Sequence, residues 1–200
     1  MSATKDVQDS ILADAKRAAV VDVIDIRYWH YKKDGTTYAP KGGLNLAPRQ
    51  HARLMKIGVV TFDEAYKAVS EYRTKYPTKA VTYYAENYPD MAWAVLMAGG
   101  SCPVLQVKDP EFIHAASQMA VVPVNDGNYK QLGKIGTGII IYSQSKSKIP
   151  VILENGNFVL KFVNSKSGEV IVVNKSIKGG HVFDLETNGS KAGVYWFQKI

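Results

Sequence analysis

A chain of 200 residues and 22.1 kDa is long enough for one large domain or two small ones. It falls short of the roughly 250 residues of a complete eight-stranded β/α barrel. Its apolar share of 46% and charged share of 22% are ordinary for a globular protein and exclude a disordered chain or a coiled coil. The apolar runs are too short for a membrane span, and no secretory signal is visible in residues 1–14. The lone Cys102 excludes an internal disulfide framework and a multi-cysteine metal site, and we expect it to be a small buried residue.

The net charge of +7 is distributed unevenly along the chain. Residues 1–124 carry 15 basic and 13 acidic side chains, whereas residues 125–200 carry 10 basic and 5 acidic ones. Every basic residue after Lys108 is a lysine. Proteins that bind nucleic acids cluster their charge on one face and favour arginine, while these late lysines are scattered between apolar pairs, as on solvated strand edges. We therefore expect no nucleic-acid partner.

The first part of the chain alternates helical and extended patterns. Apolar residues at helical spacing predict a helix over 6–19, and the run 20–29, apolar on both faces, predicts a strand that is covered on both sides. After a long loop, Thr61 and Glu64 have capping-box spacing and open a helix that Pro77 stops. The remaining predicted elements are a strand over 79–85, a helix between 87 and 99, and a helix over 109–119. This order is typical of β/α units with parallel strand pairing.

The second part, from Asn125 onward, carries no helical signal. Glycine-containing turns separate short apolar runs at a spacing of about ten residues, which is typical of a small antiparallel sandwich. The predicted strands cover 138–143, 149–153, 158–163, 170–174, 181–185 and 193–197. We therefore predict an α/β domain over 1–124 and an all-β antiparallel sandwich over 125–200.

Two carboxylates in the first part are candidates for catalysis. The loops at the carboxyl ends of parallel strands converge on one mouth, and the two predicted strands bring Asp25 and Glu86 to that end. Neighbouring strands lie about 4.8 Å apart, so both side chains can face one cleft. A pair of carboxylates is the minimum requirement for glycoside hydrolysis, so we predict that Asp25 and Glu86 are catalytic. The alternative is structural: Asp25 and Arg27, two apart on one strand face, simply neutralise each other in a buried setting.

Aromatic residues are concentrated around the same strands. Nine of the twelve tyrosines fall between Tyr28 and Tyr88, and sugar rings, with C–H faces beside hydroxyls, suit the amphipathic surfaces of Tyr and Trp. We expect Tyr66, Tyr72 and Tyr76 in the core of their helix instead. The polar loop over 42–51 contributes Arg49 and His51 as further candidates for substrate binding. An ordinary surface loop would explain this segment equally well. The predicted substrate-binding residues are Arg27, Tyr28, Trp29, Tyr83, Tyr84, Arg49 and His51. The four histidines show no metal-ligand spacing, so we expect no metal. The glycines do not form a phosphate-binding loop pattern, and we expect no cofactor.

Three motifs stand in the first part of the chain: VDVIDIRYW at 21–29, the loop over 38–50, and TYYA at 82–85. They resemble the C-terminal portion of a large uncharacterised bacterial family classed with glycoside hydrolases. The resemblance implies a β/α barrel of the TIM type, of which this chain would hold only the last units, a carbohydrate partner, and a secreted or periplasmic location. Because two parallel strands alone leave unpaired edges, we expect the chain to form a homo-oligomer or to lack the N-terminal half of the barrel.

The second part carries a resemblance of its own. Its residues 128–142 and 164–169 are similar to the β-sandwich that follows such barrels and is labelled a collagen-binding domain. That sandwich offers a tryptophan-aromatic-acid-proline run, whereas this chain has KFVNS at 161–165. Packing on the barrel is therefore its expected role. Two functions remain open: a carbohydrate-active protein that uses the two carboxylates, and a non-catalytic accessory module that binds a glycan or a protein.

Overall fold

The computed structural model describes all residues except 39–59, 85–88, 146–147, 188 and 190–191. The chain forms two compact units, Met1–Val104 and Leu105–Ile200. The first is a mixed α/β region, and the second is dominated by a six-stranded antiparallel sheet, so the predicted fold class is confirmed. The boundary between the units, after Val104, lies before Asn125, where the sequence pattern changes. The reason is that the last helix of the chain, over 110–118, belongs to the second unit. The assignment of domains to 1–124 and 125–200 stays a prediction.

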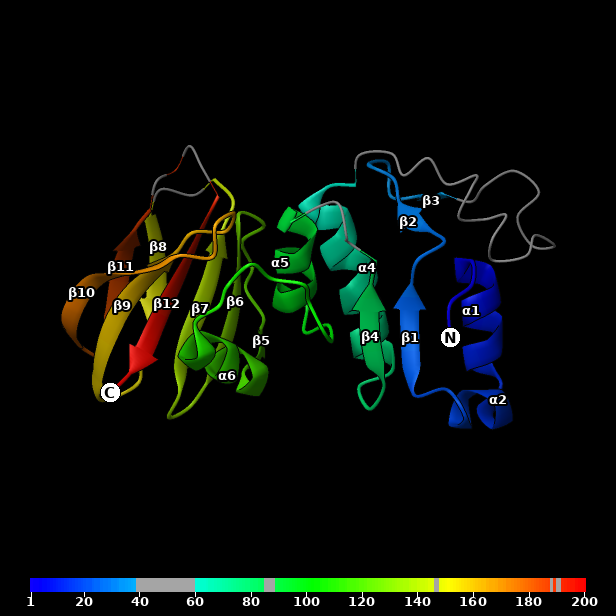
Figure 1. Cartoon of the computed structure of the whole chain (residues 1–200), viewed down its shortest axis with the longest axis horizontal. Coiled ribbons are helices and arrows are strands. Elements are labelled where there is room, and N and C mark those ends of the chain that lie inside the picture. The colour runs from blue at the N-terminus through cyan, green and yellow to red at the C-terminus, as the bar shows by residue number, and fades with distance from the viewer. Residues whose placement is uncertain (39–59, 85–88, 146–147, 188, 190–191) are drawn as a thin grey trace. The chain divides into compact units, whose positions relative to one another are not determined.

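The first unit holds a parallel strand pair and its helices (Figure 1). Its elements are α1 (Lys5–Ala13), α2 (Ala15–Ala19), β1 (Val23–Ile26), β2 (His30–Tyr31), β3 (Thr37–Tyr38), α4 (Phe62–Lys75), β4 (Ala80–Tyr83) and α5 (Pro89–Met97). β1 and β4 pair in parallel, with Asp25 opposite Thr82. On the other side of β1, Ser2 forms a parallel bridge to Asp25. Three successive segments therefore run in parallel, with α1 and α2 between the first two and α4 between the last two.

The single helix predicted over 6–19 is two helices. Asp14 ends the first with an extended backbone and caps the second, because its side chain accepts hydrogen bonds from the amides of Lys16 and Arg17. The residues that α1 buries are Gln8 and Leu12. Gln8 is polar, and its burial is explained by its hydrogen bonds to Asp25 and Trp29.

The helix predicted to start at Thr61 forms as α4. The hydroxyl of Thr61 accepts from the amide of Glu64, and the Glu64 carboxylate accepts from the amide of Thr61, which completes the capping box. Tyr72 of this helix is fully buried, as expected, while Tyr66 and Tyr76 pack at the margin of the core. The core unites buried residues of α1, β1, α4, β4 and α5.

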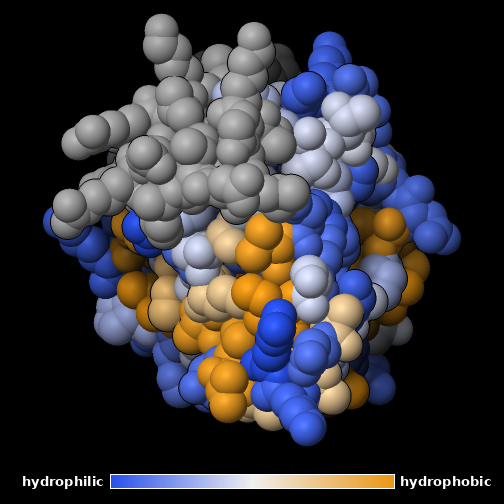
Figure 2. Space-filling view, turned by 90° about the vertical axis from the view of Figure 1, so that its right-hand side faces the viewer, coloured by the Kyte–Doolittle hydropathy of each residue, from blue (hydrophilic) through white to orange (hydrophobic). Residues whose placement is uncertain are grey.

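The helices of the described part of this unit cover one face of the strand pair. Ile24, Ile26 and Val81 alternate onto that face and are at most 1% exposed. Val23, on the other face, is 40% exposed, so the prediction of a strand covered on both sides is wrong. Seen from the side on which α1 lies, the surface shows a hydrophobic area at the centre and lower left and another at the right edge, with hydrophilic residues between them (Figure 2).

The second unit is a sandwich of a large and a small antiparallel sheet. Its elements are α6 (Pro110–Gln118), β5 (Ala120–Val122), β6 (Tyr129–Lys134), β7 (Gly138–Ser143), β8 (Lys148–Ile152), β9 (Asn157–Val163), β10 (Val170–Lys178), β11 (Val182–Glu186) and β12 (Gly193–Lys199). The large sheet has the order β10-β9-β12-β7-β6-β5, and β11 pairs with β8 in the small one. All six strands predicted here exist, and β5 and β6 are additional.

Residues from both sheets share one hydrophobic core. Ile149 and Val151 of β8 are fully buried, while their neighbours along the strand are exposed, as expected for a strand with one covered face. They pack in the same cluster as Leu160 and Phe197 of the large sheet. Helix α6 packs on this unit through Phe112, whose ring meets the Trp196 ring edge-on with 5.4 Å between the ring centroids.

Cys102 is exposed, so the expectation of a buried thiol is wrong. It follows α5 with a φ of 52°, in a bend that turns the side chain outward instead of into the core. Among the residues that the structure describes, no helix has the length and apolar character needed to cross a membrane.

Candidate active site

The candidate site lies on the face of the β1–β4 pair that α4 does not cover. Because side chains alternate along a strand, Asp25 and Thr82 point away from the buried face that carries Ile24 and Val81. Arg27 follows at the end of β1 and Tyr84 at the end of β4. These four residues form what we call the β1–β4 cluster.

Asp25 is the centre of the cluster. One carboxylate oxygen accepts a hydrogen bond of 2.9 Å from the Thr82 hydroxyl, and the other accepts one of 2.9 Å from Nε of Arg27. The Asp25 side chain is 19% exposed and that of Arg27 is 46% exposed. The guanidinium carbon of Arg27 lies 5.1 Å from the centroid of the Tyr84 ring, a cation–π distance. The ion pair of the structural alternative therefore forms, and it leaves Asp25 accessible to solvent.

The main chain of Asp25 is also fixed, on the side away from β4. Its amide donates to the carbonyl oxygen of Met1 at 2.8 Å, and its carbonyl oxygen accepts from Nε2 of Gln8 at 2.8 Å. Oε1 of the same Gln8 accepts from the indole N–H of Trp29 at 2.6 Å. Gln8 thus joins the strand that carries Asp25 to the hydrophobic core, which accounts for its complete burial.

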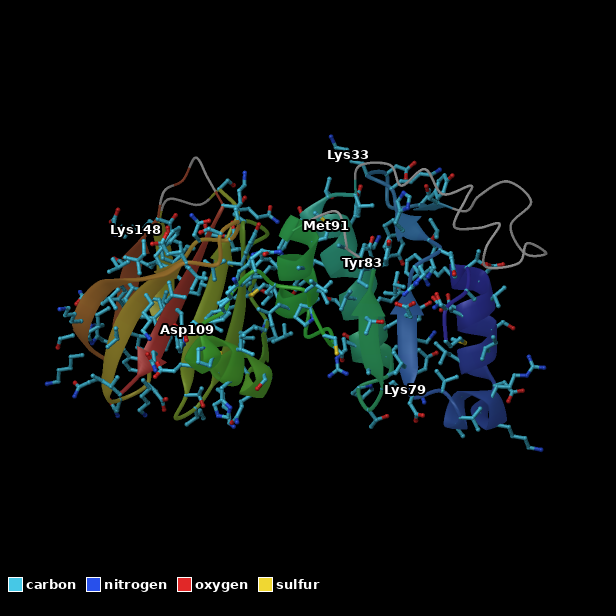
Figure 3. The ribbon with its side chains drawn as sticks, in the orientation of Figure 1. Lys33, Lys79, Tyr83, Met91, Asp109 and Lys148 are labelled. Carbon is cyan, nitrogen blue, oxygen red and sulfur yellow. The ribbon has the colours of Figure 1, made fainter. Side chains whose placement is uncertain are left out.

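The two ends of the strand pair differ in chemistry. Figure 3 shows Lys79 at the beginning of β4 and Tyr83 at its end. Nζ of Lys79 donates to the carbonyl oxygens of Ala18 and Val21 at 2.7 and 2.6 Å, which ties α2 to the start of β1. That end serves stability, whereas the carboxyl end carries Asp25 and Arg27 on an accessible face.

The structure brings some of the predicted substrate-binding residues together and separates others. Arg27 and Tyr84 lie beside Asp25. Trp29 is 1% exposed in the core and so has no ring face to offer a sugar. Tyr83 alternates onto the helix-covered face, where burial, aided by the charge of Glu64, raises its pKa well above that of a free tyrosine. Glu86, Arg49 and His51 lie outside the described residues, and Tyr28 is half-buried.

A second polar cluster, which the sequence did not predict, lies between α1, β2 and α4. Nζ of Lys5 donates to carboxylate oxygens of Asp9 and Glu71 at 2.7 and 2.8 Å. The Tyr72 hydroxyl donates to Asp9 at 2.9 Å, and the Tyr31 hydroxyl donates to Glu71. The Lys5–Asp9 spacing of four along a helix was a visible signal. The partners on α4 were not, because they are more than 60 residues away.

Among the described residues, no group of three or more His, Cys, Asp or Glu side chains is placed to hold a metal ion. The functional groups of the β1–β4 cluster are a carboxylate that accepts hydrogen bonds, a hydroxyl and a guanidinium that donate them, and an aromatic ring. This set suits the recognition of hydroxyl groups and apolar ring faces.

Comparison with known proteins places the chain in a family. The family described as "Domain of unknown function (DUF6298)" matches residues 1–119. No curated protein matches the sequence. A solved structure described as a glycoside hydrolase is similar with a TM-score of 0.53 and 11% sequence identity, over 92% of this chain and 54% of that one. A glycoside hydrolase family 5 structure from Bacteroides vulgatus ATCC 8482 is similar with a TM-score of 0.48 and 9% identity, over 67% of this chain and 44% of that one. The chain thus spans about half the length of the solved structures that it matches.

Proposed function

We propose that this chain, which belongs to the DUF6298 family, is part of a carbohydrate-active protein related to the glycoside hydrolases. On this proposal, the first part of the chain supplies the last β/α repeats of a barrel. The β-sandwich follows it, as the collagen-binding-type domain follows the barrel in the family that the sequence resembles. The observation that carries the proposal is the position of Asp25: an accessible carboxylate, oriented by two donors, at the carboxyl end of a parallel strand pair.

In β/α folds this end of the strands carries the chemistry, because the loops that follow the strands meet there. A catalytic carboxylate must be held in one orientation to act on a glycosidic bond. Thr82 and Arg27 hold Asp25 from two directions, and the main-chain bonds to Met1 and Gln8 fix the strand beneath it.

Glycoside hydrolysis needs a second carboxylate. We assign that role to Glu86, which follows Tyr84 by two residues in the sequence. Both hydrogen-bond partners of Asp25 donate to it, which suits a group that acts as nucleophile or base in its ionised form. Glu86 then acts as the acid that protonates the leaving oxygen. Tyr84 and Arg27 provide a stacking surface and a donor for the sugar beside them.

A polysaccharide panel with a reducing-sugar assay tests the proposal. We compare the wild type with Asp25→Asn and Glu86→Gln, and with Asp22→Asn as the matched control. Asp22 is an exposed aspartate just before β1, at the opposite end of the same strand. We expect the first two variants to lose about 100-fold or more in turnover, and the control to keep the wild-type rate. Equal turnover in all four proteins would remove the roles of Asp25 and Glu86.

The second candidate function is that of an accessory module that binds a glycan or a protein without cleaving it. The satisfied Asp25–Arg27 ion pair favours it. Binding of a polysaccharide by the wild type, with no product released from any member of the panel, would decide for the accessory module.

A further inference from the structure

A cavity of about 450 Å³ lies between the beginning of α1 and the β2–β3 hairpin. Its lining residues are Thr4, Lys5, Asp6, Asp9, Tyr31, Thr37 and Tyr38. The volume is within the range of about 300–1,000 Å³ that is typical of small-molecule sites. A second hollow, in the β-sandwich, measures about 250 Å³ and is lined mainly by apolar side chains. The cavity beside α1 is both larger and richer in convergent polar groups.

The floor of the cavity is a rigid charged network. Lys5 is held between Asp9 and Glu71, and its ammonium lies 5.5 and 5.4 Å from the centroids of the Trp29 and Tyr72 rings. Burial alone would lower the pKa of Lys5, but hydrogen bonds and charges from the two carboxylates raise it above its ordinary value. The ammonium therefore stays charged, and the groups that face the cavity are fixed before a ligand arrives.

The charges of this network exclude two classes of ligand. Among the described residues, the carboxylates of Asp6, Asp9 and Glu71 outnumber two cations, Lys5 and Lys67, the second of which lies 4.1 Å from the centroid of the Tyr31 ring. The local charge is therefore negative, and an anion such as phosphate or an acidic sugar is repelled. A metal ion is disfavoured too, because the Lys5 ammonium already occupies the space between the two carboxylates that would bind it.

A neutral saccharide fits the groups that remain. Asp9 uses one oxygen for Lys5 and one for Tyr72, and an ionised carboxylate can accept about four hydrogen bonds. Asp6 on the rim and the hydroxyls of Thr4 and Thr37 add acceptors and donors for sugar hydroxyls. Tyr38 adds an aromatic ring, the group that packs against the C–H face of a sugar. The His30 ring stacks on it at 4.8 Å and fixes its orientation.

The cavity is separate from the β1–β4 cluster. Its wall residue Tyr31 belongs to the same buried core as Ile24 and Ile26, on the helix-covered side of β1. The Asp25 side chain alternates onto the opposite side of that strand. A ligand in the cavity therefore does not compete with one at Asp25, and two weak sites on one protein strengthen its retention on a polymer.

We propose that the cavity lined by Thr4, Asp6, Asp9 and Tyr38 is a second binding site, specific for neutral saccharides. The proposal goes beyond the proposed function, because the ligand class follows from the cavity's own groups and does not require turnover at Asp25. If it is correct, the protein binds a neutral sugar even when the chemistry assigned to the β1–β4 cluster is removed.

The test is a titration of the ¹⁵N-labelled full chain, followed by amide chemical shifts. The probes are cellobiose, mannobiose, xylobiose and galactobiose, with galacturonic acid and inorganic phosphate as charged comparisons, each to roughly 50 mM so that a site with a millimolar dissociation constant is filled. We expect at least one neutral disaccharide, and neither anion, to shift amides of residues 4–9 and 37–38. Tyr38→Ala should weaken binding about tenfold through the lost ring contact.

Three variants make the outcome decisive. Asp6→Asn, on the exposed rim, keeps the fold and should weaken binding several-fold, which covers the case in which Tyr38→Ala disturbs the hairpin. Asp22→Asn should bind as the wild type does, and Asp25→Asn is titrated beside it to show whether the shifts at residues 4–9 and 37–38 depend on the β1–β4 cluster. The proposal is overturned if no neutral disaccharide shifts these amides, or if the anions shift them equally. It is also overturned if Asp25→Asn abolishes binding while Asp6→Asn does not, because the sugar then sits at the β1–β4 cluster. Loss of turnover in Asp25→Asn with unchanged sugar binding would leave both proposals standing independently.

Discussion

Replacing Gln8 by leucine tests the link between the hydrophobic core and the candidate site. Gln8 is fully buried, accepts from the Trp29 indole at 2.6 Å and donates to the carbonyl oxygen of Asp25 at 2.8 Å. Leucine has nearly the same volume, so the substitution removes hydrogen bonds and leaves the packing largely intact. The indole N–H of Trp29 then remains buried without a hydrogen bond, and the part-buried carbonyl oxygen of Asp25 loses its side-chain donor.

The expected cost follows from counting those partners. Each buried donor or acceptor that loses its partner costs about 1–3 kcal/mol, so two of them should lower the free energy of unfolding by about 3 kcal/mol. This is a large share of the roughly 5–15 kcal/mol that stabilises an ordinary domain. The matched control is Ser10→Ala, at an exposed position of the same helix, which should change stability by less than about 0.5 kcal/mol.

Urea unfolding followed by circular dichroism at the helix band measures the effect, because α1, α2, α4 and α5 all belong to the first unit. With a denaturant slope of about 1–3 kcal/mol/M, a loss of 3 kcal/mol lowers the midpoint by roughly 1–3 M. A midpoint for Gln8→Leu that coincides with that of Ser10→Ala would refute the reasoning, since it would mean that water or a shifted backbone satisfies both groups.

Three further predictions concern single contacts. Thr61→Ala removes one half of the α4 capping box and should cost about 1 kcal/mol of stability in the same urea assay. Gly138→Ala places a Cβ 2.0 Å from a main-chain oxygen of β12, whereas Gly136→Ala meets nothing within 4 Å. Both glycines have positive φ, so either substitution should lower the free energy of unfolding by about 1–2 kcal/mol through backbone strain. Only Gly138→Ala should lower it by several kcal/mol more, because of the clash. Equal losses of stability in the two variants would contradict the clash. Burial and the bond to Glu71 raise the pKa of Tyr31 to about 12, so the unfolded chain releases this proton first and stability falls as pH rises from about 10 to 12. Tyr31→Phe should flatten that fall in urea midpoints measured across the range, and an unchanged slope would exclude Tyr31 as its source.

Local signals predicted the elements of this fold well. The capping box at Thr61 and the Asp109–Pro110 pair set the starts of α4 and α6, because the side chains that satisfy the free amides are only two or three residues away. The strands of the sandwich were predicted from alternation and from glycine turns. β7 agrees with its predicted bounds at both ends, since Gly138 and the residues after Ser143 interrupt the pattern on either side.

Long-range contacts account for what the sequence did not predict. Gln8 is polar, and its burial depends on Trp29 and Asp25, which are 21 and 17 residues away. Periodicity within the helix contains no information about those partners. The prediction for Trp29 was wrong for a different reason. It was predicted at a strand mouth, but β1 ends at Ile26, so the rule that every second residue shares a face no longer applies three residues later.

The candidate site was predictable to the extent that it depends on strand alternation. Asp25 and Arg27, two apart, had to share a face, and they form an ion pair there. The partner strand supplied Thr82 through its register, which no local pattern specifies. One strand thus serves two surfaces, with Ile24 and Ile26 in the core and Asp25 on the accessible face. Because the Gln8 bonds join those two surfaces, a substitution in the core that moves β1 also moves the Asp25 carboxylate. The stability of this unit and any activity at Asp25 are therefore expected to respond together to changes at Gln8, but separately to changes in Arg27, which touches only the accessible face.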